Sequence, residues 1–438
     1  MRLDQIEIKN FRCFEDAKFD FDENFTVFIG ENGSGKSAVI DAVTIVFVQF
    51  GMAMEDLWSK AYMRANHQNQ IRLLTSELPD SAPFVECWPM AIIGKVSAAD
   101  YVEAPFNFGF SSSPDKGNAF HGSLNVFASR LREGESNLES PQTWPVLVCF
   151  RAGRVSHVQK SLDWNSVMTQ KPLRRNGYND WGNAEVAGSE FSAWLARNEA
   201  ISFQEGKESP LVTGVKKAVV NCIPDAIDIR FITRVSEPVI TWKNGEKMPF
   251  SKLSDGQRAM LAMVGDIARR AALLNPHLGE KAPAETPGIV MIDEIDLHLH
   301  PRWQRQIVDD LKRTFPKMQF IATTHSPFII QSLEEGELRK LGESGELEQI
   351  PIEYSDNGLE EIVRFIQGVE LPATSERYAE KKEAAKDFFS KLRAGLNEKD
   401  PDLVRAKERF QQARGSSGLG PEVEALIEVK GAKSEATE

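Results

Sequence analysis

Positions 30 to 37 of the chain carry the octapeptide Gly30-Glu31-Asn32-Gly33-Ser34-Gly35-Lys36-Ser37. It matches the phosphate-binding pattern GxxxxGK(S/T). The apolar run Phe25 to Ile29 before it predicts a buried parallel strand, and Lys36 to Phe50 after it predicts a helix. The alternative is a glycine-rich turn that matches the pattern by chance. The predicted strand before it and the predicted helix after it argue against this alternative. The octapeptide therefore predicts a P-loop nucleotide-binding core of the α/β class.

The residue types of this loop explain how it would hold a triphosphate. Glycines let successive backbone N–H groups face phosphate oxygens, and the N-terminal end of the following helix adds partial positive charge. Lys36 is expected to neutralise the β- and γ-phosphates, and Ser37 is expected to bind Mg²⁺. We therefore expect ATP and Mg²⁺ as cofactors, with all eight residues of the octapeptide binding the nucleotide.

A second apolar run, Gly288 to Ile292, ends in the two acids Asp293 and Glu294. Beside a P-loop, a buried strand that ends in acids is the expected place for a Walker B motif. Asp293 would then hold the Mg²⁺, and Glu294 would act as the catalytic base that polarises the attacking water. The alternative is an ordinary charged strand end, which the phosphate loop makes less favourable.

A third predicted strand, Met318 to Thr324, is followed by His325. A lone histidine is more often structural than catalytic. However, the carboxyl ends of parallel strands meet at one edge of the sheet, which is where a ligand binds. We therefore interpret His325 as a catalytic residue that contacts the γ-phosphate.

The string Leu253-Ser254-Asp255-Gly256-Gln257 precedes an amphipathic helix that runs from Arg258 to Leu274. Ser254 is placed as the N-cap of this helix, and a helix N-terminus with a glycine beside it is again a phosphate site. Two anion sites for one triphosphate are explained if Ser254, Gly256 and Gln257 bind the nucleotide of a neighbouring copy. The string thus predicts a head-to-tail dimer that clamps ATP between two chains.

Several of these strings resemble a known family. The phosphate loop, the LSDGQ string and the string DEIDLHLHP at 293–301 resemble the SMC/RecF branch of ABC-type P-loop ATPases, over residues 1 to about 330. Within that branch, the strings at 10–14, 288–307 and 315–327 look like small bacterial ATPases that accompany HNH nucleases. These are the PtuA family of the Septu antiphage system and the related ATPases of retron cassettes.

The resemblance implies an ABC-type P-loop ATPase fold with an inserted segment and a helical C-terminal extension. It implies that Asp296 to His300 form a D-loop along the dimer seam and that Arg12 lies near the adenine. It also implies an ATP-hydrolysing defence subunit that regulates a separate HNH endonuclease, with DNA reached through the complex. Alternate spacing of His298 and His300 does not favour a zinc site. We find no counterpart of the Q-loop glutamine.

Composition limits the other functions of the 438-residue chain. Its net charge of -12 argues against a surface that coats nucleic acid, because such binding needs clustered Lys and Arg. The four cysteines form no CxxC pair, so a zinc ribbon or disulfide framework is not expected and a reducing cytoplasm fits. No run is long and apolar enough to predict a membrane span. Neither an HNH-like cluster nor the strand acids of a Toprim domain are present, so no nuclease site is expected in this chain.

The motifs suggest four regions along the chain, at residues 1–50, 51–240, 241–335 and 336–438. The first region holds the phosphate loop, and the second is an insertion with a helical and β subdomain. The sequence leaves the topology of this insertion open up to about residue 150. The third region holds the signature, Walker B, D-loop and histidine motifs, and the fourth is a helical region for assembly or partner docking.

Three local patterns complete the predictions. Asn244-Gly245 predicts a tight hairpin over Val239 to Pro249. The basic block Arg151 to Arg175 favours a solvated face over a contact with a polyanion. Helices are expected over Ser375 to Ala394 and, with Asp400 as the cap, from Pro401 onward. The first of these carries the apolar residues Tyr378, Ala385, Phe388, Phe389 and Leu392.

Three functions remain in competition. The first is the defence ATPase described above, and the second is a RecF/SMC-like DNA repair ATPase that binds DNA ends or gaps. The third, the motor of a membrane transporter, is the least favoured, since no surface for a membrane partner is apparent. Co-purification with an HNH protein would favour defence, whereas tight DNA binding by the isolated chain would favour repair.

Overall fold

The computed structural model describes residues 1–54, 71–75, 84–98, 106–113, 117–121, 127–128, 131–132, 141–152, 173–182, 187–343, 345–350, 354, 357–368, 384, 387–388, 391 and 400–414. Among these residues, no helix combines the length and the apolar content that a membrane crossing requires. The chain divides into two compact units, residues 1–367 and residues 368–438.

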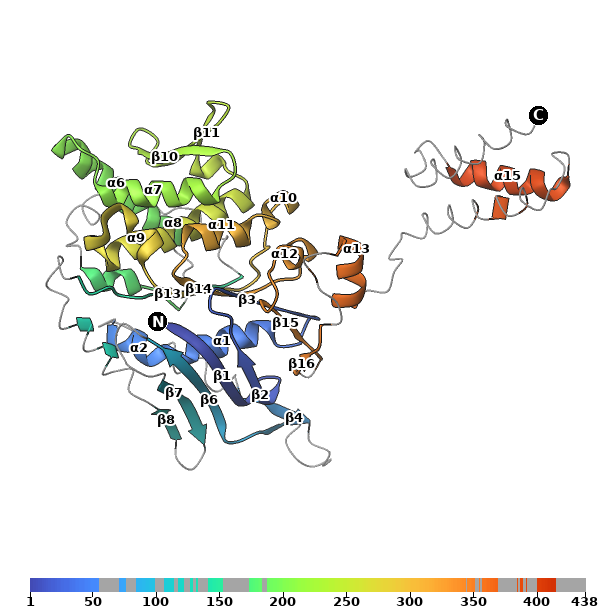
Figure 1. Cartoon of the computed structure of the whole chain (residues 1–438), viewed down its shortest axis with the longest axis horizontal. Helices are drawn as coiled ribbons and strands as arrows, with labels where there is room; N and C mark the ends of the chain where they lie inside the picture. Colours follow the sequence, from blue (N-terminus) through green and yellow to red (C-terminus); the bar gives the residue numbers. More distant parts are fainter. Residues whose placement is uncertain are drawn as a thin grey trace. The chain divides into compact units, whose positions relative to one another are not determined.

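The core of the first unit is a six-stranded sheet in the order β16-β15-β3-β14-β13-β9 (Figure 1). Its strands are β3 (Phe25–Gly30), β9 (Val146–Phe150), β13 (Gly288–Ile292), β14 (Met318–Thr323), β15 (Leu338–Leu341) and β16 (Leu347–Glu348). All neighbours are parallel except β15 and β16. The central strands are continuous buried apolar runs because both faces of the sheet are covered. The three strands predicted from apolar runs are confirmed.

Helix α1 (Lys36–Val46) follows β3 directly and is continued by α2 (Val48–Met54), so the helix predicted over 36–50 is interrupted at Phe47. One face of α1 meets the parallel sheet, and the other meets a five-stranded antiparallel sheet in the order β2-β1-β6-β7-β8 (Figure 1). Its strands are β1 (Arg2–Phe11), β2 (Phe14–Asp20), β6 (Met90–Ser97), β7 (Phe106–Ser113) and β8 (Gly117–His121).

The topology of the segment from 51 to 150 is open in the sequence. In the structure, this segment contributes strands to both sheets. It supplies β6 to β8 to the antiparallel sheet, where β6 pairs with β1, and β9 to the edge of the parallel sheet. It also supplies a two-stranded sheet of β4 (Leu73–Thr75) and β5 (Phe84–Glu86). The return of the chain through these strands places the end of β9 beside the end of β13.

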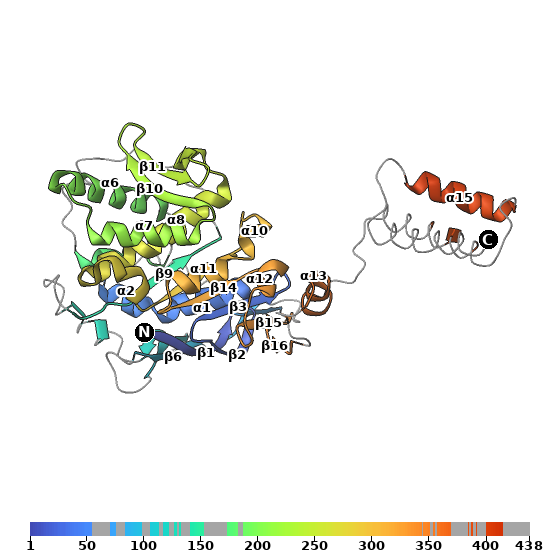
Figure 2. The same cartoon turned by 45° about the horizontal axis from the view of Figure 1, so that its top comes forward.

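A helical layer covers the opposite face of the parallel sheet (Figure 2). Its long helices are α6 (Ala187–Glu205), α7 (Pro210–Cys222) and α8 (Asp255–Leu274). The shorter helices of the first unit are η1 (Arg174–Tyr178), η2 (Phe250–Lys252), η3 (Pro276–Lys281), α9 (Ala282–Glu285), α10 (Pro301–Gln304), α11 (Ile307–Thr314), α12 (Pro327–Gln331), α13 (Leu359–Glu361) and η4 (Ile362–Ile366), of which α13 and η4 contact α12.

A three-stranded sheet packs on α6 and α7 and leads into α8. Its strands are β10 (Ala226–Ile232), β11 (Glu237–Trp242) and β12 (Lys247–Pro249). The hairpin predicted around Asn244-Gly245 is confirmed, and Gly245 supplies the positive φ of 82° that the tight turn needs.

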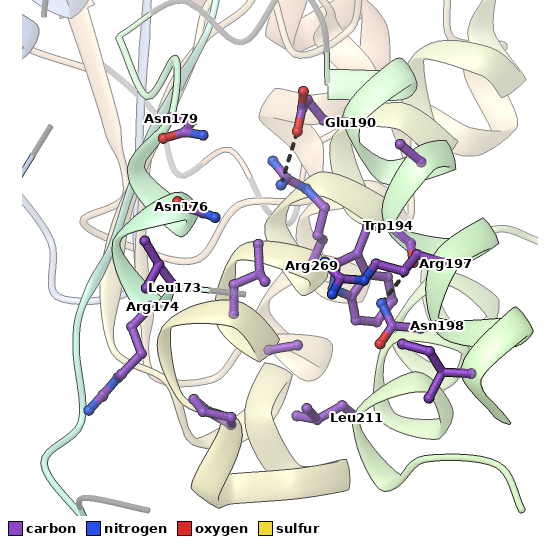
Figure 3. Close-up of a pocket in the computed structure, with 15 residues that line it drawn as sticks. Leu173, Arg174, Asn176, Asn179, Glu190, Trp194, Arg197, Asn198, Leu211 and Arg269 are labelled. Carbon is purple, nitrogen blue, oxygen red and sulfur yellow. Dashed lines mark hydrogen bonds and ion pairs between the residues drawn. The ribbon is translucent and has the colours of Figure 1, made fainter. Parts of the chain in front are cut away.

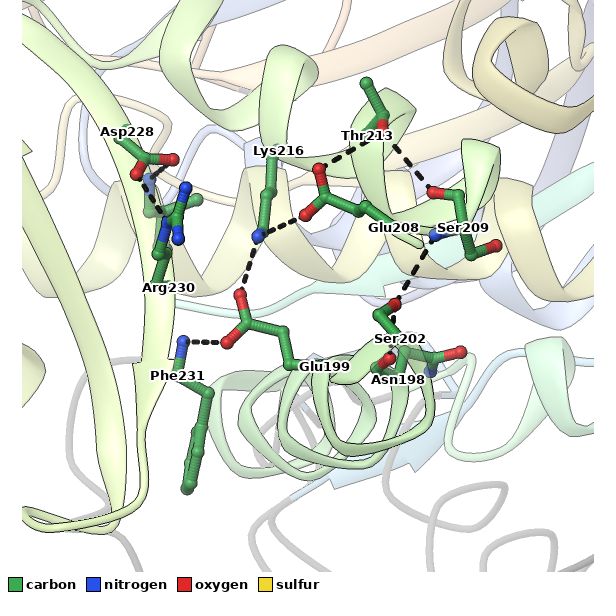
Figure 4. Close-up of polar contacts among 11 residues, drawn as sticks. Asn198, Glu199, Ser202, Glu208, Ser209, Thr213, Lys216, Asp228, Arg230 and Phe231 are labelled. Atoms are coloured by element: carbon green, nitrogen blue, oxygen red, sulfur yellow. Dashed lines mark hydrogen bonds and ion pairs between the residues drawn. The ribbon is translucent and has the colours of Figure 1, made fainter. Parts of the chain in front are cut away.

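Lys216 on α7 ties this layer together through ion pairs (Figure 4). Its Nζ lies 2.6 Å from Oε1 of Glu199 on α6 and 2.5 Å from Oε1 of Glu208. The other carboxylate oxygen of Glu199 accepts a 3.0 Å hydrogen bond from the backbone N–H of Phe231 on β10. One buried ammonium group therefore joins both helices and the small sheet.

Lys216→Met is expected to lower the free energy of unfolding by about 2 kcal/mol, because it removes charge-assisted bonds and leaves Glu199 without its cation. Lys217→Met is the matched control, since Lys217 is 63% exposed and its pair with Glu280 lies in solvent. That surface pair should contribute less than about 1 kcal/mol. Urea unfolding followed by circular dichroism compares the two variants, and equal losses would contradict the assigned role of Lys216.

The second unit contains α15 (Pro401–Arg414). This helix begins at Pro401, as Asp400-Pro401 predicts, and the backbone N–H of Asp402 donates to the Asp400 carboxylate. The Phe388 ring stacks on the Phe410 ring of α15 with 5.5 Å between centroids. Phe388 therefore packs inside its own unit. Most of the helix predicted over 375–394 lies outside the described residues, as do Tyr378, Ala385, Phe389 and Leu392.

Candidate functional site

The octapeptide forms the turn between β3 and α1. Gly30, Gly33 and Gly35 have φ values of 152°, 91° and 102°, which side-chain-bearing residues rarely adopt. A Cβ at Gly35 would lie 2.6 Å from Sγ of Cys13 and 2.7 Å from the ring of Phe14. Cys13 in the β1–β2 turn and Phe14 at the start of β2 thus form a wall behind the loop, which sequence reasoning missed.

Lys36 lies inside the loop, where its Nζ donates to the carbonyls of Gly30 at 2.9 Å and Glu31 at 2.7 Å. Burial lowers the pKa of Lys36, whereas the nearby Asp293 and Glu294 act to raise it. The hydroxyl of Ser34 is buried and has no hydrogen-bond partner in the described part of the chain. A buried ammonium group and a buried unpaired hydroxyl in one glycine-rich turn fit a phosphate ligand.

The metal ligands predicted from opposite ends of the sequence lie together. The Ser37 hydroxyl donates to Oδ1 of Asp293 at 3.1 Å. Thr323, the last residue of β14, donates to the same oxygen at 2.7 Å and accepts the backbone N–H of Glu294 at 2.7 Å. A hydroxyl beside a carboxylate is the hard oxygen donor set that suits Mg²⁺. Thr323 was not predicted, and its only sequence signal is its place at the end of the third strand.

Glu294 and His325 lie at the same edge of the sheet. Glu294 adopts a positive φ of 53° directly after β13. Burial lowers the pKa of His325, and the charge of Lys36 lowers it further, which favours the neutral imidazole. Asp296 accepts from the Thr324 hydroxyl at 2.5 Å and from the backbone N–H of His325 at 3.4 Å. This network sets the backbone on which the histidine stands.

Arg12 forms an ion pair that sequence reasoning did not predict. Its Nη2 lies 2.5 Å from Oδ2 of Asp41, and Arg151 binds Oδ1 of the same carboxylate. Asp41 lies one turn after Ser37 on α1, so both side chains share a face of the helix. Arg151 follows β9 and comes level with Asp293, whose backbone N–H donates to Phe150 at 2.8 Å.

Arg151 therefore lies at the end of β9, next to the Walker B acids that follow β13. The glutamine of a Q-loop stays unassigned. The placement of Arg12 near the adenine stays a prediction. Residues 153–172 of the basic block lie outside the described residues, but Arg151 and the buried Arg174 are paired. For these two arginines, the solvated face expected from the sequence does not hold.

The signature string caps α8 as predicted. The Ser254 hydroxyl accepts the Gln257 backbone N–H at 3.3 Å, and the Gln257 side chain accepts the Ser254 N–H at 2.9 Å. A Cβ on Gly256 would lie 2.3 Å from the carbonyl of His298, so the signature packs on the 296–300 turn of its own chain. In the part of the chain that the structure describes, no hydrogen bond joins residues 254–257 to residues 30–37.

The two histidines of the 296–300 turn have local structural features. Nδ1 of His300 accepts the N–H of Arg302 at 3.2 Å and caps α10, and His298 has a positive φ of 63°. Across the described ranges, no group of three or more His, Cys, Asp or Glu side chains is arranged to hold a metal ion.

Family models match the chain in two segments. Residues 1–77 match the family described as "AAA ATPase domain". Residues 96–331, more than half of the chain, match the family described as "AAA domain, putative AbiEii toxin, Type IV TA system". The chain belongs to this AAA-domain family. The matched segment of the AAA-domain family contains the signature string, both Walker B acids and His325.

Curated relatives of this AAA-domain protein include a retron ATPase and a Septu protein. It is 24% identical to the "Retron Vc95 probable ATPase" of Vibrio cholerae serotype O1 biovar El Tor over 78% of this chain and 74% of that protein. It is also 24% identical to the "Septu protein PtuA" of Bacillus mycoides (strain KBAB4), over 79% of this chain and 41% of that protein. The resemblance to retron and Septu ATPases is confirmed.

Among solved structures, an SMC head bound to the C-terminal winged-helix domain of ScpA has a TM-score of 0.48 and 16% identity. That comparison covers 78% of this chain and 94% of the other. The parallel sheet, the phosphate loop and the family match together define an ABC-type P-loop ATPase fold.

Proposed function

We propose that this chain binds and hydrolyses MgATP as a subunit of an antiphage defence complex. One observation supports this most strongly. Lys36, Ser37, Asp293 and His325 come from three separate segments and meet at the carboxyl edge of three parallel strands. The retron and Septu names of the relatives supply the defence setting.

Each residue has a role in the proposed reaction. The loop N–H groups and Lys36 would bind the phosphates, and Ser37 and Asp293 would hold Mg²⁺. Bound there, Mg²⁺ would neutralise charge on the β- and γ-phosphate oxygens. Glu294 accepts a proton from the attacking water, and neutral His325 donates a hydrogen bond towards the γ-phosphate. Thr323 orients Asp293 and the backbone of Glu294 through its two bonds.

We further propose that two copies close head to tail around ATP. In the capping box of α8, the Ser254 hydroxyl accepts the backbone N–H of Gln257, and the Gln257 side-chain carbonyl accepts the backbone N–H of Ser254. This cap leaves a helix N-terminus facing outward, where Ser254 and Asp255 are exposed. Such an end can receive the phosphate of a second chain.

This geometry gives a mixing test. Ser254→Arg and Lys36→Ala are each expected to be inactive alone, since each blocks both composite sites of its homodimer. A heterodimer of the two variants contains one intact site, so an equal mixture should regain about a quarter of wild-type ATP turnover. Phosphate release is measured after native mass spectrometry has shown heterodimers. Heterodimers without any turnover would contradict the shared site.

The partner is proposed to be a separate HNH endonuclease, with DNA reached through that complex in the cytoplasm. The second unit, residues 368–438, which contains α15, is the proposed docking or assembly element. Purification from the native operon followed by mass spectrometry tests this proposal. An HNH protein is expected, whereas tight DNA binding without any partner would favour a RecF-like repair function.

A further inference from the structure

A cavity of about 270 Å³ lies in the helical layer, between η1, α6 and α8 (Figure 3). None of its lining residues belongs to the phosphate loop, the Walker B acids or the signature string. It is therefore a separate site on the same unit of the chain.

The cavity arises from the way α6 and α8 cross. They meet closely at Phe191 and Gly265, where a Cβ on the glycine would lie 2.8 Å from the aromatic ring. Beyond this contact the two helices present the small residues Ala193 and Ala272 to the space between them. Two alanines cannot fill the gap that a close helix crossing leaves further along, so a void remains.

The face of α6 that lines the cavity carries Trp194 and Arg197, which are spaced three apart and so lie side by side. On α8, the buried Arg269 is held in place by Asp266, through bonds of 3.0 and 2.6 Å, and by Glu190 at 3.5 Å. These two walls therefore combine an indole, two guanidinium groups and the carboxylate of Glu190, and the guanidinium group of Arg269 is held in place by ion pairs.

The opposite wall carries two amide side chains beside Arg174, whose guanidinium group donates to the backbone carbonyls of Leu274 and Gln142. Asn176 of η1 and Asn179, which follows it, point towards the α6 side chains across the cavity (Figure 3). Leu211 and Leu273 supply apolar surface. Amide groups can hydrogen-bond the edge of a nucleobase, an indole stacks on its face, and guanidinium groups bind phosphate. These are the three recognition elements that a nucleotide requires.

We propose that this cavity binds a nucleotide, with its base against Trp194 and its phosphate at Arg197. The same chemistry is offered by a free mononucleotide and by an unpaired nucleotide of single-stranded nucleic acid. The binding itself does not depend on the proposed ATPase activity.

Because α8 forms part of the cavity wall, a bound ligand would also affect ATP turnover. This second step rests on the proposed function. The last two turns of α8 form one wall, and the first turn is the signature string at Ser254. A ligand that spreads α6 from α8 would tilt this single 20-residue helix and so move the signature. Occupancy would thereby change ATP turnover by the dimer.

Calorimetry on the full chain with Lys36→Ala tests the proposal, because that change disables the phosphate loop. AMP and an eight-nucleotide oligothymidylate are the two probes. Arg197→Ala should weaken binding at least about tenfold, and Ala272→Leu should abolish it by filling the void. Arg230→Ala, on a 66% exposed arginine of β10, should change nothing.

The results with the two probes distinguish a free mononucleotide from an unpaired nucleotide of single-stranded nucleic acid. Binding of AMP identifies a free nucleotide, and binding of the oligonucleotide alone identifies an unpaired nucleotide of a strand. No binding of either probe, or binding that Arg197→Ala leaves unchanged, overturns the proposal even if Ala272→Leu fails to fold. If wild-type protein neither binds nor hydrolyses ATP while Lys36→Ala still binds AMP, the proposed function fails and the cavity site stands.

Discussion

Replacement of Lys36 by alanine should abolish ATP binding at the phosphate loop, with the Kd of that site raised by more than about 100-fold. The ammonium group is buried in the loop and now donates to two carbonyls, Gly30 and Glu31. Backbone N–H groups remain in the variant, but they cannot offset the charge of three phosphates without a cation. Fluorescence titration with a labelled ATP analogue measures the loss.

Lys317→Ala is the control for this variant, because Lys317 is 55% exposed and pairs with Glu285 in solvent. It should bind ATP with wild-type affinity. ATP affinity that is unchanged in Lys36→Ala would overturn the assignment of the phosphate loop, provided that circular dichroism shows a folded protein.

Glu294→Gln should leave ATP affinity within about threefold of wild type while lowering turnover by about 10²- to 10⁴-fold. The amide has the size of the carboxylate and can still hydrogen-bond water, but it cannot accept the proton. Because Thr323 holds the backbone N–H of residue 294 at 2.7 Å, the substitution should not move the chain. Single-turnover hydrolysis with a direct binding measurement separates the two effects.

The matched control is Glu246→Gln, on an exposed glutamate of the β11–β12 hairpin. It should hydrolyse ATP at the wild-type rate. Wild-type turnover in Glu294→Gln would show that another group activates the water.

Both predictions concern residues that a short sequence pattern identifies, because the pattern and the chemistry are local. The glycines of the loop must lie within a few residues of Lys36, and a buried parallel strand is a continuous apolar run wherever it occurs. For the same reason the strands Phe25–Gly30, Gly288–Ile292 and Met318–Thr323 were predictable almost to the residue. The cap of α8 at Ser254 is equally local.

The surroundings of the site were not predictable in this way. Asp41 and Arg151 are separated by 110 positions, and Thr323 and Asp293 by 30, so only the order of the strands brings them together. The described strands of the segment from 51 to 150 belong to more than one sheet. No local sequence pattern predicts which of these strands pair with each other.

By itself, then, the sequence determined the phosphate loop, the acids that follow the strands and the signature cap, because each depends on neighbours within a few residues. Tertiary structure alone decided which arginines bind Asp41, which hydroxyl orients Asp293, and where α6 and α8 leave a cavity between Ala193 and Ala272. A side chain's partners and the space beside it depend on how distant elements pack, and packing is a property of the whole fold.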